Sequence, residues 1–358
     1  MYSLSTHDSI EAIPQQAWNR LNGPDTPFLR HEFLAAMERH GCLGADFGWL
    51  PRHLALRDTK GELVAAAPCY LKLNSYGELV FDWSWASVYE RLGLPYYRKL
   101  VVASPYLIRG SLQVAEQLGV SSLHWLFTSD TGTHALERQG LMRRVGCQFH
   151  WDNRGYEDFD HFLSTFSSAK RKQVRRERRR VAEAGIRFRL LSGHEISDQE
   201  WATFHQLYCD TFDKRGGIPT LSLGFFREIG RTLADHCLLV PAYHRGEIVA
   251  AAFDLVGARS LYGRHWGCFS DFHSLHFETC YYQCLEFCIQ RGLSRFEPGA
   301  QGEHKISRGF LPTPTWSAHW IADNGVREAI DHFLKRERDG MRDYLSQMHE
   351  RSPYKAST

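Results

Sequence analysis

Short apolar runs and amphipathic stretches alternate along most of the chain, with turn residues between them. In the first half, the pattern predicts helices at about 30–40, 111–119 and 132–139, and strands at about 52–57, 62–71, 79–85, 100–103, 122–127 and 141–151. In the second half, it predicts helices at about 198–213, 222–235, 275–291 and 326–348, and strands at about 259–267, 294–297 and 315–322. Strands mixed with helices in this way predict an α/β (α+β) fold, in which helices flank a mixed sheet.

One octapeptide occurs twice, once in each half of the chain. Residues 60–67 read KGELVAAA, and residues 245–252 read RGEIVAAA. Each copy follows an apolar run and a turn, so each is predicted to enter the second strand of a β-hairpin. Chance is the alternative, but eight aligned positions that are identical or conservatively exchanged favour duplication. We therefore expect two related domains, at residues 1–155 and 156–350, followed by a loose tail at 351–358.

Composition narrows the class of protein. The chain has 358 residues, of which 43% are hydrophobic and 23% charged, as in ordinary globular proteins. This length suits two domains. The formal net charge of +2 gives no reason to expect a DNA partner. The sequence contains no apolar run of transmembrane length and nothing that reads as a signal peptide, so we expect a cytoplasmic protein.

The nine cysteines are scattered along the chain and are expected to be reduced thiols. Cys280, Cys284 and Cys288 are spaced so that they share one face of a helix. A metal site is one interpretation of this spacing. Thiols stacked over two turns converge poorly on one ion, however, and no His completes a familiar pattern. We therefore expect small buried core residues here and no metal.

A strongly basic segment lies between the two halves. Residues 170–180 read KRKQVRRERRR, in which eight of eleven residues are basic. Serines precede the segment and Gly185 follows it, so a helix is predicted at 167–185. The helix is either a solvated basic surface or a site for phosphate, such as the pyrophosphate of a cofactor or lipid precursor, or an RNA backbone. The candidate phosphate-binding residues are Arg171, Lys172, Arg175 and Arg176.

Three stretches of the second half concentrate acids, imidazoles and cations. They are residues 262–267 (YGRHWG), 273–278 (HSLHFE) and 297–310 (EPGAQGEHKISRGF). Loops that leave strand ends commonly form the ligand site of an α/β domain. The candidate catalytic residues are Glu278, Glu303, His304 and Lys305. The candidate substrate-binding residues are Arg264, His265, Trp266, His276, Gln301 and Arg308, with His265 a further candidate base.

These residue types suit acyl transfer to an amine. The amine must lose a proton, so the site needs a base. Glycines and cations in 299–309 suit a phosphate or a developing oxyanion. P-loop, GxGxxG, GxSxG and HExxH motifs are all missing from the sequence. Taken singly, each of these His residues is more often a structural or surface group than a catalytic one, and the alternative role of Glu278 is to favour the dipole of its helix.

The first half carries an aromatic segment at 75–86 that either lines a pocket or packs in the sheet core. Because the acids and imidazoles concentrate in the second half, we interpret the first half as a degenerate scaffold.

Five motifs resemble a known family. They read LKLNSYGELVFDWSWASVYERLG, SSAKRKQVRRERRR, LYGRHWGC, LHFETCYYQ and FEPGAQGEHKISRGF. Together they resemble the FemAB-like predicted N-acyltransferases, a bacterial family described as related to peptidoglycan biosynthesis. The resemblance extends from about Phe28 to Trp320. It implies two tandem GNAT-like domains.

The better-known Fem ligases transfer amino acids from aminoacyl-tRNA to a peptidoglycan precursor, and a basic helix precedes their second domain. The resemblance places that helix at Lys170–Arg180. A late lysine of those ligases has no matching position, although Lys305 and Arg308 lie nearby. The stretch Ser104–Ser111 is shorter than in the family.

Three functions remain open from the sequence. The first is an N-acyltransferase with acyl-CoA as co-substrate and a small molecule or cell-wall precursor as the amine acceptor. The second is an aminoacyl-tRNA-dependent ligase, with charged tRNA as the donor. The third is a non-catalytic phosphate-binding or RNA-binding protein.

Overall fold

The structure is a computed structural model that describes residues 2–23, 25–78, 82–102, 107–270, 272–300 and 302–355. Two compact units are present, each assembled from separate stretches of the chain. Unit 1 contains Met1–Gly23, Leu29–Cys147 and Pro314–Ser346. Unit 2 contains Pro24–Phe28, Gln148–Thr313 and Gln347–Thr358.

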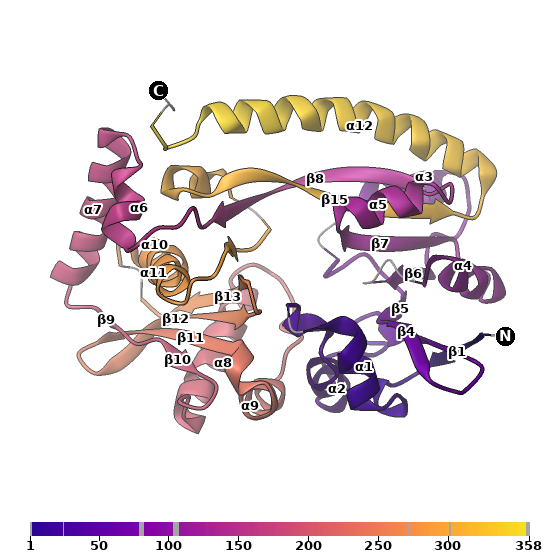
Figure 1. Cartoon of the computed structure of the whole chain (residues 1–358), viewed down its shortest axis with the longest axis horizontal. Helices are drawn as coiled ribbons and strands as arrows, with labels where there is room; N and C mark the ends of the chain where they lie inside the picture. The colour runs from indigo at the N-terminus through magenta and orange to yellow at the C-terminus, as the bar shows by residue number, and fades with distance from the viewer. Residues whose placement is uncertain are drawn as a thin grey trace. The chain divides into compact units, whose positions relative to one another are not determined.

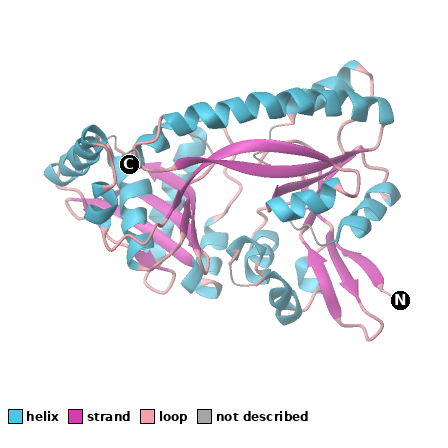
Figure 2. Ribbon diagram, turned by 45° about the horizontal axis from the view of Figure 1, so that its top comes forward, coloured by secondary structure: helices cyan, strands magenta, loops and turns pink. Residues whose placement is uncertain are grey.

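This division differs from the predicted boundary after residue 155, because the long helix α12 (Asn324–Glu350) lies mainly in unit 1. Its apolar face packs with Trp85 and Met142 of that unit through Val326, Ile330 and Leu334. Within unit 1, Figures 1 and 2 show the helix running along the first part of β8 (Met142–Asp152) and the last part of β15 (Leu311–Ile321). Periodicity predicted the helix but not the core that it joins.

The predicted loose tail is also partly ordered. Tyr354 forms a β-bridge with Phe166, and its hydroxyl donates to the Gly309 carbonyl oxygen at 2.7 Å. The amide of Ser167 donates to the Pro353 carbonyl oxygen at 2.9 Å. Residues 352–355 therefore pack within unit 2, because the tyrosine ring lies against the Phe162 and Phe166 rings.

Unit 1 contains two sheets. The smaller has the order β1 (Ser3–His7), β3 (His53–Arg57), β4 (Leu63–Ala67), and Figure 2 shows it as a separate group of strands near the N-terminus. The larger has the order β2 (Trp49–Pro51), β5 (Cys69–Lys72), β6 (Lys99–Val102), β7 (Ser122–Thr128), β15, and only its β6–β7 pair is parallel. The helices are α1 (Gln15–Asn22), α2 (His31–Arg39), α3 (Trp83–Arg91), α4 (Ile108–Gln117) and α5 (Asp130–Glu137).

Two strand predictions in this unit were wrong. The strand expected at 62–71 is two strands, because Pro68 cannot donate a ladder hydrogen bond and the chain passes there from one sheet to the other. Residues 83–85, predicted as strand, begin α3, and residues 79–81 lie outside the described part. Aromatic side chains favour strands, but Trp85 and Tyr89 are four residues apart and bury the same helix face.

Unit 2 is built on one sheet with the order β10 (Leu191–Ser192), β11 (Cys237–His244), β12 (Glu247–Val256), β13 (Ser260–Cys268), β14 (Arg295–Glu297), β8, and β9 (Arg187–Phe188) also pairs with β11. The β13–β14 pair alone is parallel. The flanking helices are α6 (Phe159–Ser164), α7 (Ser168–Glu183), α8 (Asp198–Asp213), α9 (Leu223–Thr232), α10 (Leu275–Phe277) and α11 (Gln283–Gln290).

Several sequence predictions are confirmed in the two units. The repeated octapeptides enter the second strands of the β3–β4 and β11–β12 hairpins, one in each unit. Helix α8 has the predicted bounds, and a capping box between Ser197 and Glu200 begins it. The helix predicted at 275–291 is present, with a π-helical segment, Glu278–Tyr282, between α10 and α11. Cys284 and Cys288 are buried core residues, as expected, whereas Cys280 is only partly buried.

Close contact between α8 and β13 requires a glycine at position 267. A Cβ atom there would lie 2.3 Å from the Leu207 carbonyl oxygen and 2.6 Å from its carbonyl carbon. We expect Gly267→Ala to lower the free energy of unfolding by about 1–3 kcal/mol, because backbone must shift to admit the methyl group. Urea denaturation measures this change.

The control is Gly340→Ala in α12, where an added Cβ would meet no atom within 4 Å. That change should stabilise the protein by up to about 1 kcal/mol through helix propensity. Equal effects of the two substitutions would contradict the packing argument.

Candidate functional site

The sheet of unit 2 opens between its two parallel strands. Only the first residues of β13, Ser260–Tyr262, pair with β14, where they lie beside Arg295–Glu297. β13 then continues to Cys268, whereas the chain leaves β14 at Pro298. Within the described part of the chain, no strand pairs with residues 263–268 on this side. We call this opening the β13–β14 fork. The carbonyl oxygens of Trp266 and Cys268 accept from Thr211 Oγ1 at 3.0 Å and from Lys214 Nζ at 3.1 Å, so the backbone amides are the groups that can bind a ligand.

A bulge in β13 directs neighbouring side chains to different places. Phe253 of β12 pairs with His265 and Asp254 pairs with Gly263, so Arg264 is an extra residue. The His265 ring lies 4.9 Å from the Tyr208 ring on α8. The Arg264 guanidinium lies 4.7 Å from the centre of the Phe28 ring. These two predicted substrate-binding residues therefore do not meet at one point.

Lys305 lies at the mouth of the fork, in the 3-10 turn Glu303–Arg308, which we call the Lys305 turn. Its side chain is 2% exposed, and Nζ donates to the Gly299 carbonyl oxygen at 2.8 Å. A Cβ at Gly299 would lie 3.7 Å from the Gly263 carbonyl oxygen, which places both arms of the fork beside this lysine. Burial lowers the pKa of Lys305 to about 8.

His304 contacts aromatic residues of the π segment. Its Nε2 is 2.9 Å from the Tyr281 hydroxyl oxygen, and its ring lies 5.8 Å from the Phe277 ring. Burial, together with the charges of Arg308 and Lys305, lowers the pKa of His304. The neutral imidazole is therefore the form present at neutral pH, and it can accept a proton.

The predicted acids have other partners. Glu278 is buried and accepts hydrogen bonds from Arg178 Nε at 3.1 Å and Gln283 Nε2 at 2.7 Å. Burial nevertheless raises the pKa of Glu278. Glu303 is exposed and forms an ion pair with Arg351. Both carboxylates are therefore held by cations within unit 2.

Among the predicted substrate-binding residues, His276 lies near the His304 ring, with ring centres 6.1 Å apart, and near the Trp266 ring at 5.4 Å. Burial lowers the pKa of His276 to about 4. Arg308 is buried and donates to Glu177 of α7. Gln301 lies outside the described residues. No group of three or more His, Cys, Asp or Glu side chains in the described ranges is placed to hold a metal ion.

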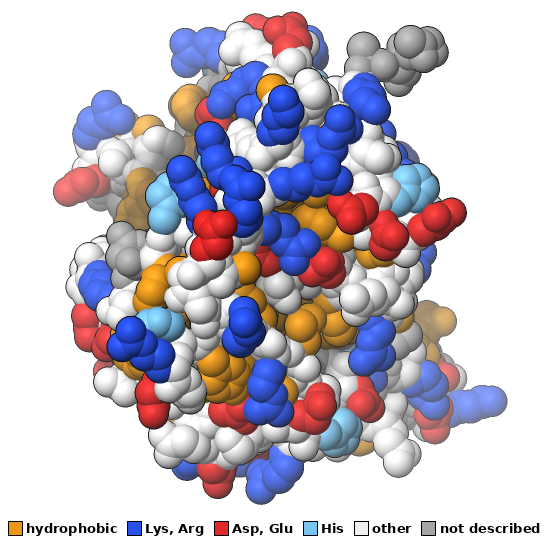
Figure 3. Space-filling view, turned by 90° about the vertical axis from the view of Figure 1, so that its left-hand side faces the viewer, with side chains coloured by type: hydrophobic (Ala, Val, Ile, Leu, Met, Phe, Trp, Pro, Cys, Tyr) orange, Lys and Arg blue, Asp and Glu red, His pale blue; other side chains and the backbone are white. Residues whose placement is uncertain are grey.

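The basic helix α7 has one face directed to solvent. Figure 3 looks onto the side that carries α6 and α7 and shows Lys and Arg side chains gathered there. Lys172, Arg175, Arg176 and Arg179 are exposed and follow one another at helical spacing. We call them the α7 stripe. Arg175 pairs with Asp160 at 3.1 Å, and the half-buried Arg171 donates to the Ser164 carbonyl oxygen at 3.5 Å.

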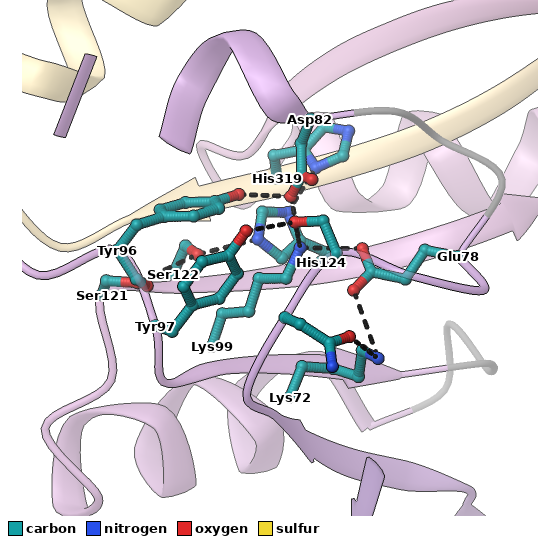
Figure 4. Close-up of polar contacts among 12 residues, drawn as sticks. Lys72, Glu78, Asp82, Tyr96, Tyr97, Lys99, Ser121, Ser122, His124 and His319 are labelled. Atoms are coloured by element: carbon teal, nitrogen blue, oxygen red, sulfur yellow. Dashed lines mark hydrogen bonds and ion pairs between the residues drawn. The ribbon is translucent and has the colours of Figure 1, made fainter. Parts of the chain in front are cut away.

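Unit 1 contains a buried polar cluster that the sequence interpretation missed (Figure 4). Lys72 ends β5 and Lys99 begins β6, they pair across the two strands, and neither is exposed to solvent. Lys99 Nζ contacts Glu78 Oε2 at 2.8 Å and Asp82 Oδ2, and Lys72 Nζ lies 3.9 Å from Glu78 Oε1. Acids and cations are therefore not confined to the second half, and that part of our interpretation was wrong.

Two histidines extend this cluster between β7 and β15. Nδ1 of His124 lies 2.7 Å from Nδ1 of His319, and serines contact the outer nitrogen of each ring. Burial lowers the pKa of His124 to about 3 and places that of His319 well below its usual value. Lysines at buried strand positions, in the runs 69–72 and 99–102, are the sequence signal that could have revealed the cluster.

The geometry defines a class of protein with two mixed-sheet units of GNAT-like architecture, each with one parallel strand pair. The chain belongs to the FemAB-like family, described as peptidoglycan biosynthesis/recognition, whose model matches residues 9–110 and 106–356. The expected fold, α/β (α+β) with two tandem GNAT-like domains, and the family resemblance are confirmed. No curated protein sequence matches the chain.

Solved structures show the same fold at low identity. FemX is 10% identical, with a TM-score of 0.55 over 92% of this chain and 100% of that chain. L-PGS from Bacillus licheniformis is 12% identical, with a TM-score of 0.52 over 88% of this chain and 98% of that one. The C-terminal domain of a putative lysylphosphatidylglycerol synthetase from Agrobacterium fabrum is 10% identical, with a TM-score of 0.54 over 87% of this chain and 92% of that one. Within the described residues, none of the helices has the length and apolar character needed to span a bilayer.

The buried histidines predict loss of stability in acid. The folded pKa of His124, about 3, lies below its unfolded value of 6.5, so the unfolded chain binds more protons between these values. Stability is present above pH 6.5 and falls as the pH is lowered, by about 2 kcal/mol for this residue between pH 6.5 and 5. We expect His124→Gln to flatten the pH dependence of the urea midpoint. The same change at the exposed His194 is the control, and an unchanged slope in His124→Gln would contradict the assignment.

Proposed function

We propose that the chain is an N-acyltransferase whose active site lies in unit 2. It transfers an acyl group from acyl-CoA, or a related activated donor, to an amine on a cell-wall-related acceptor. The observation that carries the proposal is Lys305, a buried lysine at the mouth of the β13–β14 fork. The family description supports a transferase class with cell-wall-related substrates. The choice of donor rests on the site alone.

The fork suits the donor carbonyl. The backbone amides of residues 263–268 have no strand partner on the fork side in the described part of the chain. With its pKa near 8, Lys305 is mostly protonated at neutral pH, so its ammonium can stabilise an oxyanion that forms on the carbonyl oxygen. Because Lys305 is already buried, its ammonium loses little further hydration when substrate binds.

His304 is the base that we favour. It is neutral at neutral pH, and the Tyr281 hydroxyl orients its ring. Glu278 is a weaker candidate because Arg178 and Gln283 occupy its oxygens. In the reaction, the amine nitrogen forms a bond to the carbonyl carbon and the carbon–sulfur bond of the thioester breaks. The amine proton passes to His304 and then to the leaving thiolate.

An aminoacyl-tRNA-dependent ligase is the second candidate, and the α7 stripe favours it. Four exposed cations along about two helical turns match the spacing of a nucleic-acid backbone better than a single pyrophosphate. In this case the ester carbon–oxygen bond of the charged tRNA would break in place of a thioester bond. The same fork, Lys305 and His304 would act on that carbonyl.

Lys305→Met should abolish turnover without preventing donor binding. We expect at least a hundredfold loss of thiol release from acyl-CoA in the presence of an amine panel, because the oxyanion loses its charged donor. Calorimetry with acetyl-CoA and a longer acyl-CoA would measure binding separately. Lys335→Met, an exposed lysine of α12, is the control. Full activity of Lys305→Met would refute the assigned role.

Removal of the α7 stripe tests the ligase candidate. Replacement of Lys172, Arg175, Arg176 and Arg179 by Gln should weaken binding of charged tRNA and reduce the slope of log affinity against log salt by roughly three. The matched control replaces four exposed cations of α12, which are Arg327, Lys335, Arg336 and Arg342. Equal salt slopes for both variants would exclude the stripe as an RNA contact.

A further inference from the structure

We propose that Glu177 of α7 is a positioning residue for the Lys305 turn. It acts through Arg308 and Tyr282, and it touches neither the fork nor Lys305. The inference deepens the proposed function, on which it rests for the role of Lys305. In this proposal, the buried edge of α7 positions the Lys305 turn, which is a role separate from that of the α7 stripe.

Glu177 is the one acid within residues 170–180, and it is buried. It lies on the inner edge of the helix with Val174 and Val181, which are also buried. Oε1 accepts from Arg308 Nη2 at 2.8 Å and from Gln173 Nε2 at 3.0 Å. Oε2 accepts from the Tyr282 hydroxyl. The carboxylate thus joins three elements: α7, the Lys305 turn and the π segment.

Arg308 passes this constraint directly to the backbone beside Lys305. Its Nη1 donates to the His304 carbonyl oxygen at 2.7 Å, which belongs to the peptide group joining His304 to Lys305. The guanidinium carbon also lies 3.4 Å from the centre of the Phe277 ring. The guanidinium of arginine is planar, so hydrogen bonds to both of its terminal nitrogens fix its orientation. The position of this peptide group relative to Glu177 is then fixed as well.

The contacts form a closed ring. Tyr282 contacts Glu177, and its chain neighbour Tyr281 contacts His304, whose carbonyl oxygen accepts from Arg308. Displacement of any member strains the others, so the proposed base and the proposed oxyanion donor keep their relative position. The alternative is that Glu177 only attaches α7 to the unit, as a structural ion pair would.

Arg178 allows these two roles to be separated. It follows Glu177 on the same helix and pairs with Glu286 of α11 at 2.8 Å and with Glu278 at 3.1 Å. Glu286 therefore also attaches α7 to the rest of unit 2, and among the described residues its hydrogen bonds go to Arg178 and not to the Lys305 turn. Glu286→Gln is the matched control for Glu177→Gln, since both substitutions remove one carboxylate from an α7 ion pair.

The test follows the reactivity of Lys305 and needs no substrate. Acetic anhydride would label the protein at graded pH, and mass spectrometry of the Lys305 peptide would give the midpoint of labelling. In the unmodified chain we expect that midpoint near the pKa of about 8. The ionisable groups that interact electrostatically with Lys305 are Cys280, His276, His304 and His150.

In Glu177→Gln, we expect the labelling midpoint to rise by about one unit or more, because a loosened turn lets water reach the lysine. Glu286→Gln should leave the midpoint unchanged. Tyr282→Phe removes one hydroxyl from the closed set of contacts around Glu177 and should give a smaller rise in the midpoint. This variant keeps the test available if Glu177→Gln folds poorly. An unchanged labelling midpoint in both Glu177→Gln and Tyr282→Phe, with native circular dichroism, would overturn the proposal. The proposed function is judged independently by turnover of Lys305→Met.

Discussion

A buried charge must keep a partner, and this constraint determines the local structure of both units. In unit 2, the pairing of Glu177 with Arg308 brings the inner edge of α7 against the Lys305 turn. In unit 1, the ammonium of Lys99 requires carboxylates, so the residues that follow β5 and the residue that precedes α3 must approach the start of β6. Apolar packing makes each unit compact, whereas the ion pairs of Glu177 and of Lys99 determine which segments lie beside one another.

Local patterns predicted local structure well. The repeated octapeptide identified both hairpins, and the helix predicted at about 198–213 coincides with α8. Contacts over long sequence separations were not accessible in the same way. Glu177 and Arg308 are 131 residues apart, and Glu177 looked like one more solvated residue in a basic run. Its spacing from Val174 and Val181 was nevertheless a signal that it belongs to the apolar edge. Lys72 and Lys99 were missed because buried lysines are rare.

The two units share a scaffold but place their polar groups at opposite ends of it. Each has one parallel strand pair, β6–β7 in unit 1 and β13–β14 in unit 2. In unit 1, Lys99 and Ser122 stand at the first residues of the parallel strands. In unit 2, the Lys305 turn follows the carboxyl end of β14. The two similar folds therefore do not carry the same polar site, which agrees with the rule that chemistry belongs to particular residues and not to an architecture.

The interleaving of the chain between the two units limits how the gene can be divided. Unit 1 takes its first strands from the N-terminal third of the chain and most of β15 and α12 from residues 314–346, while residues 347–358 belong to unit 2. A fragment that stops near residue 155 would lack the strand that pairs with β7 and the helix that covers Trp85 and Met142. The remaining fragment would carry α12 with its apolar face uncovered. Recombination between relatives at a single crossover in the middle of the gene would thus exchange parts of both units at once.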